Sequence, residues 1–489
     1  MKLKWLLFLG CCLLIINSCK KNPDINIVPQ PENGPPVETP TPPFTTEKFS
    51  VSNVFQNNMV VQRDKPLLIW GRATTNSKIN VTVTWNTGPF VATADQSGDW
   101  SVSIPASPVN IDPQTITCKI DDADSTTLTN ILIGDVWLCS GQSNMVMQVD
   151  ALAPFKGVTN YQQEIQAAQY PLIRFQTVQS DYQGNALSAF TYTNLWQVCS
   201  PATVGNLSGV SYFFARKLHT SLNVPIGVIV SAINGSYCRD WSNGGIYYNG
   251  MINPLLKLSL KGFIWYQGEN DQHISPASGY TDLNNQLITY WRSAFKQSSL
   301  PFYYVQMTPF AEDYFNTTPP GGDMITDYYA KFREAQSMIR LTPGTGMAVT
   351  MDVGEVENHH PSNKKPVGER LALLALKNTY NLNVECVGPQ FLSYSQSGNQ
   401  VTVNYIPGTA NGLNAINNGA LNQYFFVAGA DHVFHRATAS ISGNTVVLSL
   451  SADTPIAIQA VRYAFTSAPL TNLQNSAGLP AEPFRTDTW

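Results

Sequence analysis

The sequence predicts an α/β protein: a mainly parallel sheet covered by helices on both faces, in three layers, and flanked by two β-rich modules. Between residues 131 and 383, apolar β-branched runs alternate with amphipathic runs at helical spacing, as in β–α–β units with right-handed crossovers. At 49–130 and 384–489, short alternating runs separated by turns are typical of sandwich-like modules. We therefore expect three folded parts, with the chemistry in the central one.

Each central strand is predicted by a short apolar run that ends at a turn of small or polar residues. The first begins at Ile131 and breaks at Ser140, and the others are Leu172–Val178, Ile226–Ile233, Gly262–Tyr266, Phe302–Met307 and Met347–Val353. The predicted helices are Ser208–Ser221, Asp282–Lys296, Asp327–Arg340 and Val367–Thr379. The clearest strands of the flanking modules are Met59–Gln62, Leu67–Gly71, Ile79–Trp85, Trp100–Ile104, Val401–Tyr405, Tyr424–Ala428, Thr445–Leu450 and Ala460–Phe465.

The first 48 residues read as an export signal and a tether. Lys2 and Lys4 precede an apolar run, 5–16, that is too short to span a membrane, which predicts a signal peptide over 1–18. The run 16–19, Ile-Asn-Ser-Cys, resembles a bacterial lipobox, which implies cleavage before Cys19 and lipidation of that cysteine. Residues 19–48 are rich in Pro and Thr and predict an extended tether. The expected location is the periplasm or the outer membrane and cell surface, with membrane contact through the lipid anchor; cleavage and release is the alternative.

Composition excludes some functions. Only 13% of the 489 residues are charged and the net charge is −4, so the chain lacks the basic footprint of a nucleic-acid-binding protein. Abundant Gly, Pro and aromatic residues suit an exported, β-rich protein with a site for uncharged ligands such as sugars. Five cysteines that follow Cys19 have no CxxC spacing, which argues against a zinc site or a disulfide scaffold and leaves one bridge open: Cys118, Cys139, Cys199, Cys238 and Cys386.

The stretch 131–147, ILIGDVWLCSGQSNMVM, carries the first candidate for chemistry. Ligands of open α/β sheets bind beyond the carboxyl ends of the strands, where a serine on a tight turn can present its hydroxyl. Ser143 is therefore a candidate nucleophile. The plainer interpretation, a strand-to-helix turn capped by Ser143 or Asn144, has equal weight if nothing else in the chain answers to it.

Such a serine needs a histidine as general base, and the chain has six histidines. His359 and His360 follow a predicted strand of the sheet and precede a helix, which places them at the same edge as Ser143. We favour His360, because Pro361 stiffens the loop behind it. Metal binding by the pair is the weaker alternative, since sequence neighbours seldom chelate one ion together and no further ligand cluster appears.

Two further strand ends supply candidate hydrogen-bond donors. Gly235 can bring its backbone N–H close to a ligand because it has no Cβ, and Asn270 offers a side-chain amide. Each alone is ordinary, a turn glycine or a capping asparagine. Four strand ends that carry Ser, Gly, Asn and His in chain order are much less ordinary.

These four blocks resemble those of the SGNH hydrolases, and the longer motifs resemble the sialate O-acetylesterase family. The motifs are 59–66 MVVQRDKP, 135–145 DVWLCSGQSNM, 265–269 WYQGE and 478–485 GLPAEPFR, and the likeness runs from about Phe49 to Trp489. It implies an SGNH-type, flavodoxin-like sheet and a serine esterase that removes acetyl groups from O-acetylated carbohydrates, without metal or organic cofactor. It also implies Ser143 as nucleophile, His360 as base, and an oxyanion hole from the backbone of Ser143 and Gly235 with Asn270, or Gln267 in its place.

The acid that orients the histidine is less well defined. Many SGNH enzymes carry it three residues before the histidine, which is Glu357 here; we rank Glu357 first and Asp352 second, and a backbone carbonyl is the remaining alternative. The expected substrate is an O-acetylated sialic acid. Alternatives are acetylated xylan or another hemicellulose, a non-catalytic glycan-binding surface lipoprotein, and a lipase-like esterase for long acyl chains.

Overall fold

The computed structural model describes residues 49–120, 124–310, 327–451, 457–469 and 471–489. The chain divides into two units, 1–46 and 47–489, and the described residues belong to the second. The predicted signal peptide, Cys19 and the tether lie outside the described residues. Among the helices of the described part, none is both long enough and apolar enough to cross a membrane.

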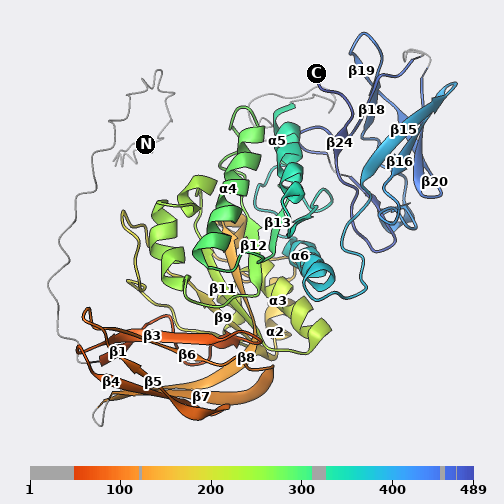
Figure 1. The fold of residues 1–489 in the computed structure, drawn as a ribbon. Coiled ribbons are helices and arrows are strands. Elements are labelled where there is room, and N and C mark those ends of the chain that lie inside the picture. Colours follow the sequence, from red (N-terminus) through yellow and green to blue (C-terminus); the bar gives the residue numbers. More distant parts are fainter. Residues whose placement is uncertain (1–48, 121–123, 311–326, 452–456, 470) are drawn as a thin grey trace, which may run out of the picture. The chain divides into compact units, whose positions relative to one another are not determined.

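The centre of the structure is a parallel sheet (Figure 1). Its spatial order is β10-β9-β11-β8-β12-β13-β14, and every neighbouring pair from β9 to β14 is parallel, whereas β10 is an antiparallel edge strand. In that order the strands are Gln197–Cys199, Tyr170–Thr177, Ile226–Ala232, Ser125–Gly141, Gly262–Tyr266, Phe302–Val305 and Thr345–Ala348. Because the chain places β11 on one side of β8 and then β12 on the other, the connections diverge at β8 and leave a crevice beyond its carboxyl end.

Helices cover both faces of this sheet (Figure 1). Successive residues of β12 point in opposite directions: Phe263 and Trp265 belong to the core beneath α4, whereas Ile264 and Tyr266 belong to the core beneath α3 and α6. This is the predicted three-layer arrangement. The helices are α1 Ser143–Val146, α2 Tyr161–Gln166, α3 Gly209–Leu222, α4 Ser278–Ala294, α5 Asp327–Met338 and α6 Lys364–Asn378. Short 3-10 or π turns are η1 Val204–Asn206, η2 Cys238–Trp241, η3 Tyr248–Ile252, η4 Asn253–Leu255, η6 Ile339–Leu341 and η7 Ile416–Asn418.

The N-terminal β region shares a strand with the central sheet. Its strands are β1 Phe49–Val51, β2 Val60–Gln62, β3 Leu67–Ala73, β4 Lys78–Val83, β5 Asn86–Thr93, β6 Asp99–Ile104 and β7 Asn110–Ile120. The first part of β8 pairs with β7, and its continuation pairs with β2, β11 and β12. The expected boundary between residues 130 and 131 therefore falls inside a strand. The sequence pattern changes there because burial becomes continuous from Ile131 onward, while the backbone ladder does not stop.

The C-terminal β region has its own core. It contains two four-stranded sheets and one strand pair, in the orders β15-β16-β21-β20, β19-β18-β22-β24 and β17-β23. Two arginines connect it to α5 and η6: the buried Arg333 donates to the carbonyl oxygens of Thr466 and Ser467, and Arg340 pairs with Glu482. The strands are β15 Phe391–Ser397, β16 Gln400–Tyr405, β17 Asn414–Ala415, β18 Phe425–Ala428, β19 Phe434–Arg436, β20 Thr438–Ser442, β21 Thr445–Ser449, β22 Ala460–Tyr463, β23 Leu473–Gln474 and β24 Phe484–Arg485.

Candidate active site

Ser143 lies on a tight turn at the end of β8, in the crevice between β11 and β12. Gly141 has φ +138°, and a Cβ at this position would lie 2.1 Å from the carbonyl oxygen of Tyr266, so the turn requires glycine. The N–H of Gln142 then donates to Tyr266 O over 2.9 Å, and α1 begins at Ser143. The strand end is thereby fixed against β12, and the serine hydroxyl follows directly.

The loop after β14 brings His360 to this hydroxyl. The two residues are 217 positions apart in the chain, and His360 Nε2 lies 2.7 Å from Ser143 Oγ. The N–H of His360 donates to Asn358 Oδ1 and its carbonyl oxygen accepts from Asn358 Nδ2, each over 3.0 Å, while the edge of the Phe155 ring packs against the imidazole at 4.9 Å. Glu355 in turn accepts from Asn358 Nδ2 and from the N–H of Ser362, so a carboxylate orders the loop without touching the imidazole.

The surroundings keep His360 neutral. Burial, followed by the positive charges of His359 and Lys364, lowers the pKa of His360 to about 4. Desolvation acts against the imidazolium, and like charges nearby act in the same direction. At neutral pH the imidazole can therefore accept the proton of the Ser143 hydroxyl.

Neither of the two predicted acids reaches this imidazole. Asp352 forms a two-point ion pair with Arg370, at 2.7 and 2.6 Å, and both side chains are largely buried. Glu357 is exposed to solvent. Within the described chain, no hydrogen bond of His360 goes to a carboxylate, so the structure contains a serine–histidine pair and does not place Glu357 or Asp352 as its third member.

The predicted oxyanion donors separate into two groups. Ser143, Gly235 and Asn270 all line one cavity of about 500 Å³ together with His360. Gly235 has φ +69°, its α-carbon faces open space, and its carbonyl oxygen accepts from Asn270 Nδ2 at 2.7 Å, which leaves the second amide hydrogen of Asn270 free for a ligand. Among the described residues, the backbone N–H groups of Ser143 and Gly235 donate to no protein acceptor.

Gln267 lies behind this cavity. Its side chain is 1% exposed, and its amide nitrogen already donates to Gln142, Ser236 and Asp271, while its amide oxygen accepts from Tyr280. It cannot also serve as an oxyanion donor. Gln142 Oε1 accepts from the N–H groups of Gly268 and Asn270, at 3.3 and 3.2 Å, so these two glutamines shape the turn that presents Asn270.

A buried polar network lies beneath the nucleophile. Asn144 accepts a hydrogen bond from Lys364 Nζ, and its Nδ2 donates to Glu269 and, at 2.9 Å, to the carbonyl oxygen of His359. Burial raises the pKa of Glu269 and lowers that of Lys364 to about 7. The sequence predicted no role for Lys364, Glu269 or the Asn358–Glu355 pair; the signal for Glu269 and Asn144 is that both stand inside the motifs 265–269 and 135–145.

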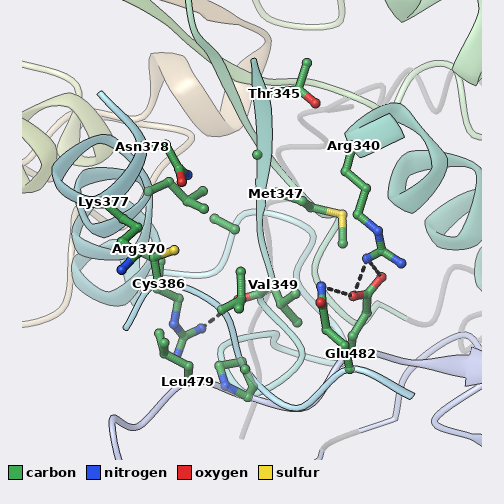
Figure 2. Close-up of a pocket in the computed structure, with 17 residues that line it drawn as sticks. Arg340, Thr345, Met347, Val349, Arg370, Lys377, Asn378, Cys386, Leu479 and Glu482 are labelled. Carbon is green, nitrogen blue, oxygen red and sulfur yellow. Dashed lines mark hydrogen bonds and ion pairs between the residues drawn. The ribbon is translucent and has the colours of Figure 1, made fainter. Parts of the chain in front are cut away.

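A second cavity, of about 370 Å³, lies beside β14 and α6 (Figure 2). Three of its charged side chains are engaged with protein partners: Arg340 pairs with Glu482, and Arg370 donates to the carbonyl oxygen of Val349 at 2.9 Å. Its lining contains no serine or histidine, so it offers no counterpart of the Ser143–His360 pair. The described cysteines Cys118, Cys139, Cys199, Cys238 and Cys386 are all free thiols, and the described residues contain no cluster of His, Cys, Asp and Glu that could hold a metal ion.

Comparisons with known proteins agree with this arrangement. The family described as "Carbohydrate esterase, sialic acid-specific acetylesterase" matches residues 133–376. The sialate O-acetylesterase of Homo sapiens is 27% identical over 398 residues, covering 70% of this chain and 73% of the human protein. The sialate O-acetylesterase of Mus musculus is 25% identical, and the match covers 89% of this chain and 94% of the mouse protein. The crystal structure of a carbohydrate acetylesterase from Xanthomonas citri is 32% identical, with a TM-score of 0.81 over 90% of this chain and 100% of its own. The chain therefore belongs to the sialic acid-specific acetylesterase family of carbohydrate esterases.

Proposed function

We propose that this carbohydrate esterase releases acetate from O-acetylated sugars by using Ser143 as nucleophile and His360 as general base. His360 Nε2 takes the proton as Ser143 Oγ attacks the acetyl carbonyl. The oxyanion is stabilised by the N–H groups of Ser143 and Gly235 and by the amide of Asn270. The imidazolium then gives its proton to the departing sugar oxygen, and water, activated by the same imidazole, hydrolyses the acetyl–serine ester.

One observation carries this proposal: the 2.7 Å contact between Ser143 Oγ and His360 Nε2 in a cavity that also holds unpaired N–H donors. Neither Glu357 nor Asp352 takes part in the proposal, because His360 is held by Asn358 and Phe155 instead. The SGNH-type, flavodoxin-like classification is part of the proposal, supported by the divergence of connections at β8.

The test measures acetate release with wild type, Ser143→Ala and His360→Ala. We expect both variants to lose nearly all turnover. In the wild-type protein we expect an acetyl group on Ser143, detected by peptide mass spectrometry after an acid quench. If wild type releases no acetate above the Ser143→Ala background, the proposal is contradicted and a glycan-binding protein is favoured. Activity that rises with acyl chain length would favour a lipase-like esterase.

The proposed substrate is an O-acetylated sialic acid, supported by the curated relatives. A second candidate is a neutral acetylated glycan such as xylan, and the charge of the cavity favours it: the lining residues of the described chain include no lysine or arginine to pair with a sialate carboxylate. Acetate release from 9-O-acetylated sialic acid and from acetylated xylan, measured side by side, discriminates between them.

We also propose that the protein is exported and lipidated at Cys19, so that the enzyme acts in the periplasm or at the outer membrane and cell surface. The support is the sequence alone: two lysines, the apolar run 5–16 and the Ile-Asn-Ser-Cys run at 16–19. Metabolic labelling with a fatty acid is expected to mark the wild-type chain in a bacterial host and to leave Cys19→Ala unlabelled. Labelling that is equal in both chains, or absent from both, would contradict lipidation at this residue.

A further inference from the structure

We infer that Lys364, which takes no part in the proposed reaction, is a positioning residue that holds Ser143 and His360 in their mutual geometry through Asn144. The inference rests on the proposed function, because it concerns the same serine and histidine. Lys364 touches neither of their reacting atoms. It acts through one amide group that joins three segments of the chain.

Asn144 contacts three segments of the chain. This residue directly follows Ser143, is fully buried, and accepts from Lys364 Nζ through Oδ1. Its Nδ2 donates to the carbonyl oxygen of His359, next to His360, and to the Glu269 carboxylate on the turn after β12. The nucleophile turn, the histidine loop and the Asn270 turn therefore meet at a single side chain.

Lys364 determines the direction in which the Asn144 amide points. An asparagine amide has two donors on one side and one acceptor on the other, and it could rotate by 180° about its last bond. The Lys364 ammonium, which can only donate, selects the orientation in which Oδ1 faces α6 and Nδ2 faces the histidine loop. Without that ammonium, the orientation of Asn144 depends on Glu269 and His359 alone.

Placing the Lys364 ammonium in the interior has a free-energy cost. Lys364 is the first residue of α6 and has 0% exposure, and its stem packs near Gly209, where an added Cβ would lie 3.6 Å from the Lys364 Cβ. An apolar side chain of similar length would fill this volume without the desolvation cost of a buried cation, which is several kcal/mol even after relaxation. The interior nevertheless contains a lysine, which indicates a use for its hydrogen bond or its charge.

The charge of Lys364 also acts on its neighbours. The groups that face Lys364 are Glu269 on the turn after β12, Glu355 on the histidine loop, and the ring of Tyr266, 5.4 Å from Nζ. Both carboxylates favour the charged ammonium, whereas burial opposes it and lowers its pKa to about 7. The cation in turn lowers the pKa of His360, together with burial and His359. Removing the charge is therefore expected to move the His360 pKa upward.

The experiment compares Lys364→Met, which removes hydrogen bond and charge, with Lys364→Gln, which keeps a shorter donor without charge. Lys365→Met is the matched control, because Lys365 is the exposed neighbour on the same helix. The readouts are kcat and KM on 4-nitrophenyl acetate against pH, and the rate at which a fluorophosphonate labels Ser143. Circular dichroism melting checks that each variant is folded.

For Lys364→Met we expect kcat and the labelling rate to fall about 10- to 100-fold with little change in KM, as for a misplaced catalytic group. The acidic limb of kcat/KM should move to higher pH in both Lys364 variants. Lys364→Gln should recover most of the lost kcat, and Lys365→Met should match wild type.

Two outcomes would overturn the inference while leaving the proposed function intact. One is a folded Lys364→Met enzyme with wild-type kcat and labelling rate. The other is a loss of kcat that Lys364→Gln does not recover and that leaves the acidic limb in place, since this would be general damage to the fold. If wild-type protein neither hydrolyses the ester nor labels at Ser143, it is the proposed function that fails.

Discussion

Replacing Asp352 with asparagine separates a structural carboxylate from a catalytic one. Arg370 holds both oxygens of Asp352 and also donates to Val349 O, and the exposed fractions of the two side chains are 10% for Asp352 and 7% for Arg370. Removing one partner of a buried ion pair leaves an uncompensated charge and costs about 3–5 kcal/mol of stability. Because no contact joins Asp352 to His360, we expect kcat per folded molecule to change little.

If Asp352 were instead the carboxylate of a catalytic triad, the same substitution would raise the activation free energy by an amount comparable to the loss of stability expected here. Loss of a triad carboxylate lowers kcat about 10⁴-fold, which corresponds to about 5.5 kcal/mol in the activation free energy. Urea unfolding followed by tryptophan fluorescence measures the first effect. The second is measured as kcat on 4-nitrophenyl acetate divided by the concentration of sites titrated with a fluorophosphonate. A 10⁴-fold loss per titrated site would refute our interpretation of the Asp352–Arg370 pair.

Two further variants sharpen this test. Asp352→Asn combined with Arg370→Met removes both charges, and because no buried charge is left unpaired, the double variant should be more stable than Asp352→Asn alone. Glu357→Ala changes an exposed side chain and should alter stability by no more than about 0.5 kcal/mol and leave kcat at the wild-type value. A large loss of kcat in Glu357→Ala would instead support the sequence prediction that Glu357 is the acid that orients His360.

Three other predictions follow from the site and from its attachment to the N-terminal region. Since burial and the charges of His359 and Lys364 lower the pKa of His360 to about 4, kcat/KM should stay level as the pH falls from about 7 to about 5 and should decline only near pH 4; a limb near the ordinary histidine pKa would contradict this. Asn270→Ala should lower kcat by about 100- to 1000-fold, measured with 4-nitrophenyl acetate, and a change confined to KM would remove Asn270 from the oxyanion hole. Arg63→Met should cost about 3 kcal/mol in urea unfolding with unchanged activity per titrated site, because the fully buried Asp135 would lose the cation that binds it at 2.9 and 3.0 Å and keep only Lys261, whose Nζ is 4.0 Å away; unchanged stability would contradict this.

The strand ends could be predicted from the sequence because chain direction alone determines which end of a parallel strand carries the site. Once the strands ending at Gly141 and Ala232 and the strand before the histidine loop are known to be parallel, their carboxyl ends must share one edge. The convergence of Ser143, Gly235 and His360 on one cavity follows from this rule. No side-chain geometry was needed for it.

The partner of the histidine could not be predicted in the same way. The loop from Val349 to Asn363 is irregular, and which of its acidic residues faces the imidazole depends on turns that have no periodic signal. Asp352 turns to Arg370 on α6, and Glu355 binds backbone and amide groups of its own loop. The start of α6 also differs from the prediction: the predicted helix begins at Val367, whereas α6 begins at Lys364 and holds Pro366 in its first turn, where N–H groups lack partners and proline is tolerated. Lys364, outside the predicted helix, is the buried first residue of α6.

The 17-residue strand β8 has a consequence for how the protein can be taken apart. The same continuous backbone forms a wall of the N-terminal region at its start and delivers the nucleophile at its end. Deleting 49–130 would remove β2 and β7 and uncover the edge of the strand on which catalysis depends. The N-terminal region is thus not an appendage that can be exchanged, and recombination of this enzyme with others should place its junctions outside residues 49–141.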